Sequence, residues 1–149
     1  MSEIANPFSA GTCFFCGPNN PSGLKLTFHR DGEDGVYADY TPEAVYCGQG
    51  DIFHGGLQMG LLDEAMWWAG YAATGVMEAV TASASFRFLR PVYIGSPIRA
   101  VCALSAREGT ALKLKGRILN ADGKVCTTVR GEYRIISRER YEAILAARP

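Results

Sequence analysis

The sequence predicts an α+β fold in which a curved antiparallel sheet of about six strands wraps around one long central helix, followed by a short C-terminal helix. Three observations predict it. The stretch 57–77 is almost wholly apolar, the segments on both sides of it alternate apolar and polar residues, and turn residues separate the alternating segments. A helix buried by the strands around it explains all three.

The central helix is expected because residues 57–77 leave no face that water would accept. A membrane span needs about 20 uncharged apolar residues, and Asp63 and Glu64 interrupt this one. We therefore expect a buried core helix.

Strands are predicted on both sides of this helix. Residues 24–30 and 36–40 alternate in polarity around an acidic, glycine-containing turn, which predicts a hairpin. Ser137 is positioned as the N-cap of a short C-terminal helix. The strands predicted after the central helix span residues 80–89, 98–107, 112–120 and 125–136.

The composition predicts a single domain, residues 1–149, with an N-terminal loop segment over 1–22. Fifteen acids balance fifteen bases, so no positive excess is available to hold nucleic acid. Residues 1–10 lack a charged-then-apolar leader, and the five cysteines are scattered and odd in number. We therefore expect a cytoplasmic protein that binds neither nucleic acid nor membrane.

The start of the predicted helix combines features of a catalytic site. Gly55 and Gly56 have no side chains, so a substrate oxygen can approach the first helical amides, where the dipole adds roughly half a positive charge. We expect the N–H of Gly55 to stabilise a developing oxyanion. The alternative is that the glycines only allow a tight turn or close helix–sheet packing.

A carboxylate in the middle of the apolar helix is the second feature. An ionised acid there is costly unless a partner or a function retains it. Asp63 is the candidate base, and Glu64 is its rival. The two project about 100° apart, so at most one faces a given pocket. Alternatively, Asp63 pairs with an arginine such as Arg87 or Arg90.

Four motifs occur in an order that resembles hotdog-fold thioesterases, the group related to phenylacetic-acid-pathway thioesterases and the human thioesterase-superfamily members. They are CFFCGPNNPSGL at 13–24, HGG at 54–56, LLDE at 61–64 and FRFLRP at 86–91. The resemblance implies a hotdog fold and hydrolysis of acyl-CoA or a similar acyl thioester. Coenzyme A would enter as part of the substrate, and we expect no metal and no other cofactor.

The resemblance also implies roles for individual residues. The family places its base or nucleophile nine positions after the histidine, which is Asp63 here. A hydroxyl at the position of Thr81 helps to orient the nucleophile or water, unless this threonine reflects only β-propensity. Ser83 is its period-two neighbour, expected on the same face. His54 would hold the turn by bonding the backbone or touch the thioester, and Gln49 stands in for a second carbonyl contact.

The spacing of the oxyanion donor and the acid predicts a shared site. Gly55 and Asp63 lie eight residues apart, or roughly 12 Å along one helix. Both must come within about 3 Å of the same carbonyl. We therefore expect two copies to pack their helices antiparallel. The resemblance implies the same, because family members are homodimers with shared sites and often pair again into tetramers.

The substrate-contacting residues are less sharply defined. Arg90, together with Arg87 and Arg99, either contacts the phosphates of coenzyme A or is an ordinary solvated arginine. Four large side chains either line a pocket for the acyl or aryl group or belong to the core. They are Met66, Trp67, Trp68 and Tyr71.

Cys13 and Cys16 form a C-x-x-C pair. A zinc site usually has four ligands, and no second close pair of cysteines or histidines follows. A redox pair would precede a helix rather than Gly17 and Pro18. We expect the pair to pack or cap an N-terminal loop near the pocket, and Cys47 and Cys102 to be small core residues.

Two other functions are compatible with the sequence. One is a non-catalytic hotdog dimer that binds acyl thioesters or fatty acids. The other is a hotdog hydratase or dehydratase, which would need a catalytic histidine working with an acid in a loop-borne motif. The sequence shows no convincing motif of that kind.

Overall fold

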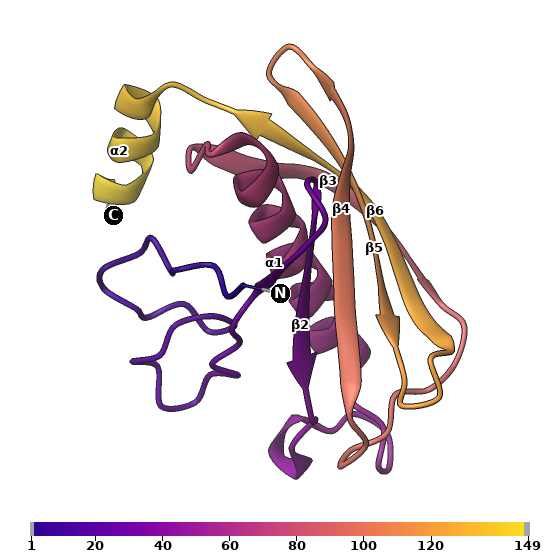
Figure 1. Ribbon diagram of the computed structural model, residues 1–149. Helices are drawn as coiled ribbons and strands as arrows, with labels where there is room; N and C mark the ends of the chain where they lie inside the picture. Colours follow the sequence, from indigo (N-terminus) through magenta and orange to yellow (C-terminus); the bar gives the residue numbers. More distant parts are fainter. Residues whose placement is uncertain (1, 148–149) are drawn as a thin grey trace.

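The computed structural model describes residues 2–147, and within them the chain forms one antiparallel sheet of six strands and two α-helices (Figure 1). The strands are β1 (His29–Asp31), β2 (Gly35–Tyr40), β3 (Ala79–Phe88), β4 (Ile98–Glu108), β5 (Ala111–Leu119) and β6 (Val125–Ile135). The helices are α1 (Gly55–Thr74) and α2 (Arg138–Ala146), and a short 3-10 turn, η1, spans Ala44–Tyr46. The expected arrangement of a curved sheet around one long helix is confirmed.

The strand order is β1-β2-β4-β5-β6-β3. The chain therefore passes from β2 through α1 to the far edge of the sheet, where β3 pairs with β6. The β4, β5 and β6 strands follow one another as antiparallel neighbours. Figure 1 shows α1 lying against one face of this sheet, while the opposite face carries no helix.

Helix α1 starts at the glycine pair, as expected, and ends at Thr74, three residues before the apolar stretch ends at residue 77. His54 is its N-cap, and the Nδ1 atom of His54 accepts the Gly56 N–H at 2.9 Å. Gly75 ends the helix in the left-handed region, with φ of 73°. Glycine adopts that conformation without a Cβ penalty, which explains why the helix stops there despite the apolar residues that follow.

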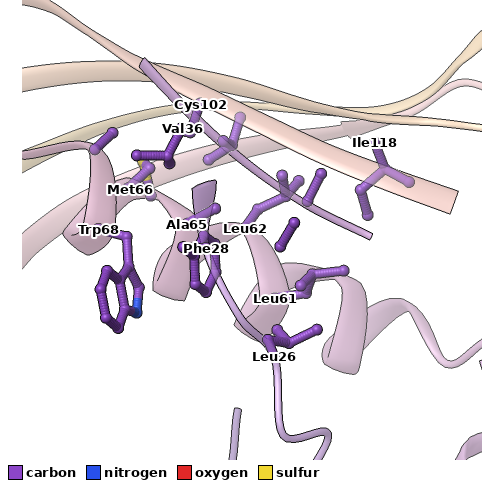
Figure 2. Close-up of a cluster of buried hydrophobic side chains, with 14 of the residues drawn as sticks. Leu26, Phe28, Val36, Leu61, Leu62, Ala65, Met66, Trp68, Cys102 and Ile118 are labelled. Carbon is purple, nitrogen blue, oxygen red and sulfur yellow. The ribbon is translucent and has the colours of Figure 1, made fainter. Parts of the chain in front are cut away.

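The core lies between α1 and the sheet (Figure 2). A Cβ at Gly131 of β6 would lie 2.5 Å from the sulfur of Met66, so this glycine makes room for a large helix side chain. Burial of these apolar surfaces is the main force that holds the helix against the sheet. The fully or almost fully buried residues from both layers include Val36, Leu61, Leu62, Ala65, Met66, Cys102 and Ile118.

The N-terminal segment covers the side of α1 that faces away from the sheet (Figure 1). A Cβ at Gly60 would lie 2.3 Å from the ring of Phe15, so the ring fits only because position 60 has no side chain. The ring of Phe8 packs on Trp67, with centroids 5.0 Å apart. The apolar helix is thus enclosed by the sheet on one side and by this segment on the other.

The strand predicted over 24–30 is correct only at its end. β1 begins at His29, and the alternating residues before it pair with the C-x-x-C segment instead of with a strand. Leu24 and Leu26 donate their backbone N–H groups to the carbonyls of Phe14 and Phe15, both at 2.9 Å. Leu24 and Leu26 are buried and Lys25 is exposed. The alternating pattern therefore reflects an extended segment with one buried face, and not a strand of the sheet.

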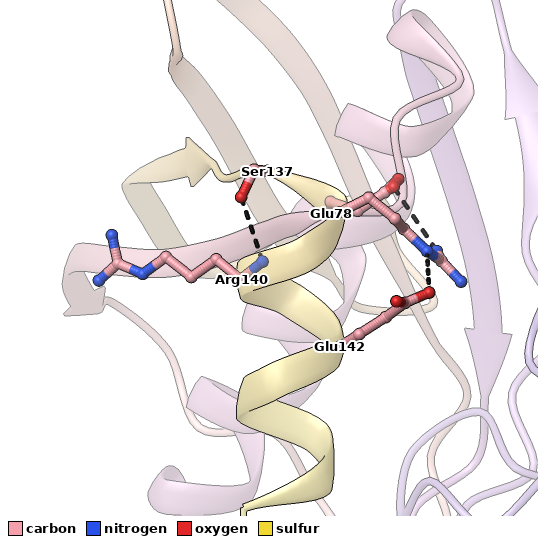
Figure 3. Close-up of polar contacts among 5 residues, drawn as sticks. Glu78, Ser137, Arg140 and Glu142 are labelled. Carbon is pink, nitrogen blue, oxygen red and sulfur yellow. Dashed lines mark hydrogen bonds and ion pairs between the residues drawn. The ribbon is translucent and has the colours of Figure 1, made fainter.

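The C-terminal helix is confirmed as predicted. The Ser137 hydroxyl accepts the Arg140 N–H at 3.1 Å, which satisfies one free amide at the start of α2 (Figure 3). Arg138 forms ion pairs with Glu142 on the next turn and with Glu78, which precedes β3. No helix in residues 2–147 is both long enough and apolar enough to span a bilayer.

The prediction for the remaining cysteines is half right. Cys102 is buried in the core, and burial raises the pKa of its thiol to about 12. Cys47 is exposed, so its assignment to the core is wrong. It follows η1 in a loop at the surface. All five cysteines are free thiols.

Candidate active site

The Asp63 carboxylate lies between α1 and the edge strand of the sheet. Its Oδ1 atom accepts hydrogen bonds from the hydroxyls of Thr81 at 2.9 Å and Tyr133 at 2.6 Å. The Tyr133 hydroxyl also lies 2.6 Å from the backbone carbonyl of Asp63. Two donors on one oxygen hold the carboxylate in a single orientation. Within residues 2–147, the other oxygen, Oδ2, has no hydrogen-bond donor.

No ion pair within residues 2–147 involves Asp63, so the alternative of a pairing with Arg87 or Arg90 does not occur in this structure. Tyr133 is instead the partner that sequence reasoning missed. Burial, and after it the charge of Asp63, raises the pKa of Tyr133 well above the usual value of a phenol. Tyr133 therefore stays protonated and remains a hydrogen-bond donor.

Glu64 points to the other side of the helix. Its Oε1 atom accepts the indole N–H of Trp68 at 3.1 Å and lies 3.6 Å from the sulfur of Cys13. The expectation that the two neighbouring acids face different surroundings is confirmed. Glu64 lies among residues of the N-terminal segment and of its own helix, away from the Thr81 and Tyr133 hydroxyls.

Gly55 and Gly56, at the start of α1, have different roles. The Gly56 N–H donates to the His54 imidazole at 2.9 Å. The expected role of Gly56 as a second oxyanion donor is therefore wrong in this structure, where its N–H makes the N-cap contact. His54 holds the turn through the backbone, which is one of the two roles expected for it. Within the described residues the Gly55 N–H has no acceptor, and it is the amide left open to a ligand.

A buried glutamine fixes this helix start in place. Gln58 is only 3% exposed, and its amide nitrogen donates to the Phe53 carbonyl at 2.8 Å. Its amide oxygen accepts the hydroxyl of Thr127, a fully buried residue of β6. Gln58 therefore ties the residue before His54 to the sheet, which fixes the direction of the Gly55 amide.

Thr81 and Ser83 lie on opposite faces of the sheet. Thr81 is opposite Tyr133 and Ser83 is opposite Glu132, because the register shifts between them by one residue at a β-bulge. Tyr133 contacts α1, so Thr81 faces the helix and Ser83 faces away from it. The expected placement of Ser83 beside Thr81 is therefore wrong, since a bulge inverts the alternation beyond it.

The large side chains of α1 divide between core and surface. Met66 and Trp68 are buried, and Trp68 stacks on Phe28 with ring centroids 5.1 Å apart. These two belong to the core. Trp67 and Tyr71 are half-buried and stack on each other at 5.1 Å, beneath the N-terminal segment.

The expected substrate contacts at the periphery are scattered. The Arg90 guanidinium donates to the Val125 carbonyl at 2.7 Å. Arg99 forms a two-point ion pair with Asp39 at 2.7 and 2.9 Å, and this arginine lowers the pKa of the Asp39 carboxyl. Gln49 is exposed in the turn before α1, where its backbone carbonyl accepts the Ile52 N–H at 3.1 Å.

Two hollows lie on the face of the sheet opposite α1, and neither is lined by Asp63 or Gly55. The larger has a volume of about 780 Å³ and is lined by basic side chains from three strands. These are Arg87, Lys115, Arg117 and Arg130.

The chain belongs to the thioesterase superfamily, because a model of that superfamily matches residues 50–127, just over half of the 149 residues. A search of curated proteins found no match. Among solved structures, the chain is 27% identical to the thioesterase superfamily protein RHA08564, with a TM-score of 0.77. That match covers 83% of this chain and 60% of RHA08564, so the chain spans less than two thirds of that relative.

Two further structures share the fold at lower identity. The PaaI protein of the E. coli phenylacetic acid degradation operon is 22% identical, with a TM-score of 0.70 over 76% of this chain and 81% of PaaI. The smu.793 protein of Streptococcus mutans, solved with acetyl-CoA bound, is 12% identical, with a TM-score of 0.69 over 75% and 89% of the two chains. The hotdog fold expected from the sequence is confirmed.

Proposed function

We propose that this protein is a cytoplasmic thioesterase that hydrolyses acyl-CoA, or a similar acyl thioester, to a free acid and a thiol. The observation that carries the proposal is the Asp63 carboxylate, with Oδ1 held by Thr81 and Tyr133 and with Oδ2 free of donors. Membership of the thioesterase superfamily supports the reaction class. At the level of the fold, the acetyl-CoA bound to the S. mutans protein supports the substrate class.

The reaction needs one group that activates water and one that stabilises the oxyanion. As general base, Asp63 accepts a proton from water while the water oxygen attacks the thioester carbon. The Gly55 N–H donates to the carbonyl oxygen as its negative charge develops. The carbon–sulfur bond then breaks, and the leaving thiolate takes up a proton. Direct attack by Asp63, followed by hydrolysis of the anhydride, uses the same groups. Neither route requires a metal ion.

The two tasks are proposed to be shared between two copies of the chain. In one chain, Asp63 accepts a hydrogen bond from Thr81, near the start of β3. Gly55 lies instead beside Phe88, at the end of β3, where a Cβ added to the glycine would be 3.4 Å from the Phe88 ring. β3 is an edge strand that pairs only with β6 within the described residues. If two β3 strands pair antiparallel, the start of one meets the end of the other. Asp63 then approaches the partner's Gly55.

The surface around β3 supports this homodimer. Several large apolar side chains near the helix start and the end of β3 are exposed: Met59 at 39%, Phe88 at 53% and Leu89 at 55%. A long exposed edge strand is also unfavourable unless another chain covers it. The homodimer would leave the outer face of the sheet free, and there the dimer can pair again into a tetramer.

The proposal is tested by a free-thiol assay over acyl-CoA substrates with short, medium, long and aromatic acyl groups. We expect turnover of at least one class by the parent protein, and a kcat/KM lower by about a hundredfold or more in Asp63→Asn, because a positioned acid–base group is lost. Asp122→Asn, which changes an exposed acid in the β5–β6 turn, is the control and should match the parent. Equal activity in Asp63→Asn and the parent would refute the role of Asp63. Binding of acyl-CoA without turnover would favour the non-catalytic dimer.

Mixing two inactive variants tests the shared site. Asp63→Asn chains still have Gly55, and Gly55→Val chains still have Asp63, so a mixed dimer regains one of its two sites. With statistical exchange of chains, the mixture should recover about a quarter of the parental activity. Native mass spectrometry confirms that mixed dimers form. Mixed dimers without activity would place both groups of a site in one chain.

A further inference from the structure

Three metal-binding side chains converge on the side of α1 away from the proposed catalytic groups. Cys13 and Cys16 come from the N-terminal loop and Glu64 from the helix, and their ligand atoms all lie within 4.8 Å of one another. Cys16 is buried, and the other two are half-buried. We infer that Cys13, Cys16 and Glu64 bind a zinc ion, with the fourth coordination position open to water.

The distances fit tetrahedral zinc. With Zn–S near 2.3 Å and Zn–O near 2.1 Å, tetrahedral angles place a sulfur and an oxygen ligand about 3.6 Å apart. The Cys13 sulfur and Glu64 Oε1 lie 3.6 Å apart. Two sulfur ligands of one zinc ion should lie about 3.8 Å apart. The two cysteine sulfur atoms are no more than 4.8 Å apart here. Little movement is therefore needed to complete the site.

The loop is shaped to bring the two sulfur atoms together. The backbone N–H of Cys16 donates to the Cys13 sulfur at 3.5 Å, and the Gly17 N–H donates to the Cys13 carbonyl at 2.9 Å. A Cβ at position 17 would lie 2.4 Å from the Cys13 nitrogen and 2.5 Å from its carbonyl oxygen. Only glycine fits after the second cysteine.

The charge of the cluster also calls for a cation. Within residues 2–147, no lysine or arginine forms an ion pair with the Glu64 carboxylate. The Trp68 indole orients the carboxylate but adds no charge. A divalent ion would supply the missing positive charge where the three side chains meet.

The glutamate favours a metal site over a redox pair. The Glu64 Oε1 atom lies 3.6 Å from the Cys13 sulfur, so a carboxylate stands directly beside the pair of cysteines. A redox-active C-x-x-C pair needs a lowered thiol pKa, which a positive environment provides and a carboxylate opposes. A carboxylate beside two thiols is, however, an ordinary third zinc ligand.

Zinc at this site would connect the N-terminal loop to α1 one residue after Asp63. Glu64 and Asp63 project about 100° apart, so the ion lies away from the thioester carbonyl. Its role is to hold the loop, and with it the Phe15 ring, against Gly60 of the helix. This role is compatible with hydrolysis that uses no metal.

Zinc uptake by the reduced full-length protein tests the site directly. We expect one zinc per chain by elemental analysis, and protection of Cys13 and Cys16 from alkylation, mapped by mass spectrometry. Cys13→Ser and Cys16→Ser should each weaken zinc binding about a hundredfold or more in competition with a chromophoric chelator, and Glu64→Gln about tenfold or more. Cys47→Ser, which changes an exposed cysteine, is the matched control and should bind zinc like the parent.

The parent protein alone can overturn the inference, even if a variant fails to fold. Reduced parent that takes up no zinc contradicts it, and so does zinc binding that Cys13→Ser and Cys16→Ser leave unchanged. A Cys13–Cys16 disulfide that forms in air, in a protein that binds no zinc after reduction, would identify a redox pair instead. Zinc binding is independent of the thioester reaction, so its failure would leave the proposed hydrolysis standing.

Discussion

Asp63 and Glu64 are neighbouring acids on one helix, and they lie in two chemically different environments. Asp63 contacts hydroxyl groups from β3 and β6, at the exposed edge of the sheet. Glu64 contacts an indole of its own helix and a thiol of the N-terminal segment. The sequence presents both as carboxylates in an apolar run, and the helical twist of about 100° per residue directs them to different partners.

The difference between the two sides follows from what covers each of them. The N-terminal segment covers the Glu64 side and packs against the helix at Gly60. The Asp63 side ends at β3, whose residues 81–85 are exposed. A carboxylate enclosed by the protein's own loop is suited to binding an ion. One at an open edge is suited to meeting a substrate and a second copy of the chain.

The largest expected difference between the two sides is in hydrolysis. Asp63→Asn should lower kcat/KM by about a hundredfold or more, whereas Glu64→Gln should lower it by less than about tenfold, because Glu64 acts only by holding the loop. Both substitutions remove a charge and keep the shape of the side chain. Steady-state kinetics on the best acyl-CoA substrate measures the ratio. A larger loss in Glu64→Gln would exchange the roles of the two acids.

Periodicity in the sequence predicted most of the fold. Strands β3 to β6 lie within one residue of their predicted bounds. In β4, β5 and β6 the buried residues alternate in part with exposed ones, whereas in β3 residues 81–85 are all exposed. The start of α1 was also close, because the glycine pair follows a capping histidine. The segment 24–28 was predicted wrongly as strand because one buried face produces the same alternation in a loop.

The surroundings of the two acids could be predicted only in part. The resemblance to a family placed Thr81 near Asp63, but periodicity alone misplaced Ser83, because a bulge leaves no mark in the pattern of polarity. Cys13 and Glu64 are in contact although they lie 51 positions apart in the sequence. The search for zinc ligands near the C-x-x-C pair therefore did not find Glu64. Tyr133 had a readable signal, as a tyrosine on the helix-facing side of its strand, but nothing linked it to Asp63.

The next largest effect concerns the hydroxyl that orients Asp63. Thr81→Val removes the donor to Oδ1 and keeps the side-chain shape, so we expect kcat to fall by about tenfold with little change in KM. Ser83→Ala is the matched control, because Ser83 lies on the opposite face beyond the bulge and should leave kcat at the parental value. The same loss in both variants would mean that the register of β3, rather than the Thr81 hydroxyl, controls the rate.

The smallest effect is the dependence of stability on alkaline pH through Tyr133. Its pKa is raised in the folded protein, so the folded state keeps the phenol proton while the unfolded state releases it above its ordinary pKa of 10.0. The stabilisation is therefore complete below pH 10 and is lost as the pH rises further. Between pH 10 and 11 the unfolding free energy of the parent should fall by about 1 kcal/mol more than that of Tyr133→Phe, which has no proton to release. Urea unfolding of the two proteins at pH 9, 10 and 11 measures this. Parallel curves would show that Tyr133 ionises as readily in the folded protein as in the unfolded chain. In that case the Tyr133 hydroxyl would not remain a hydrogen-bond donor to Asp63 at alkaline pH.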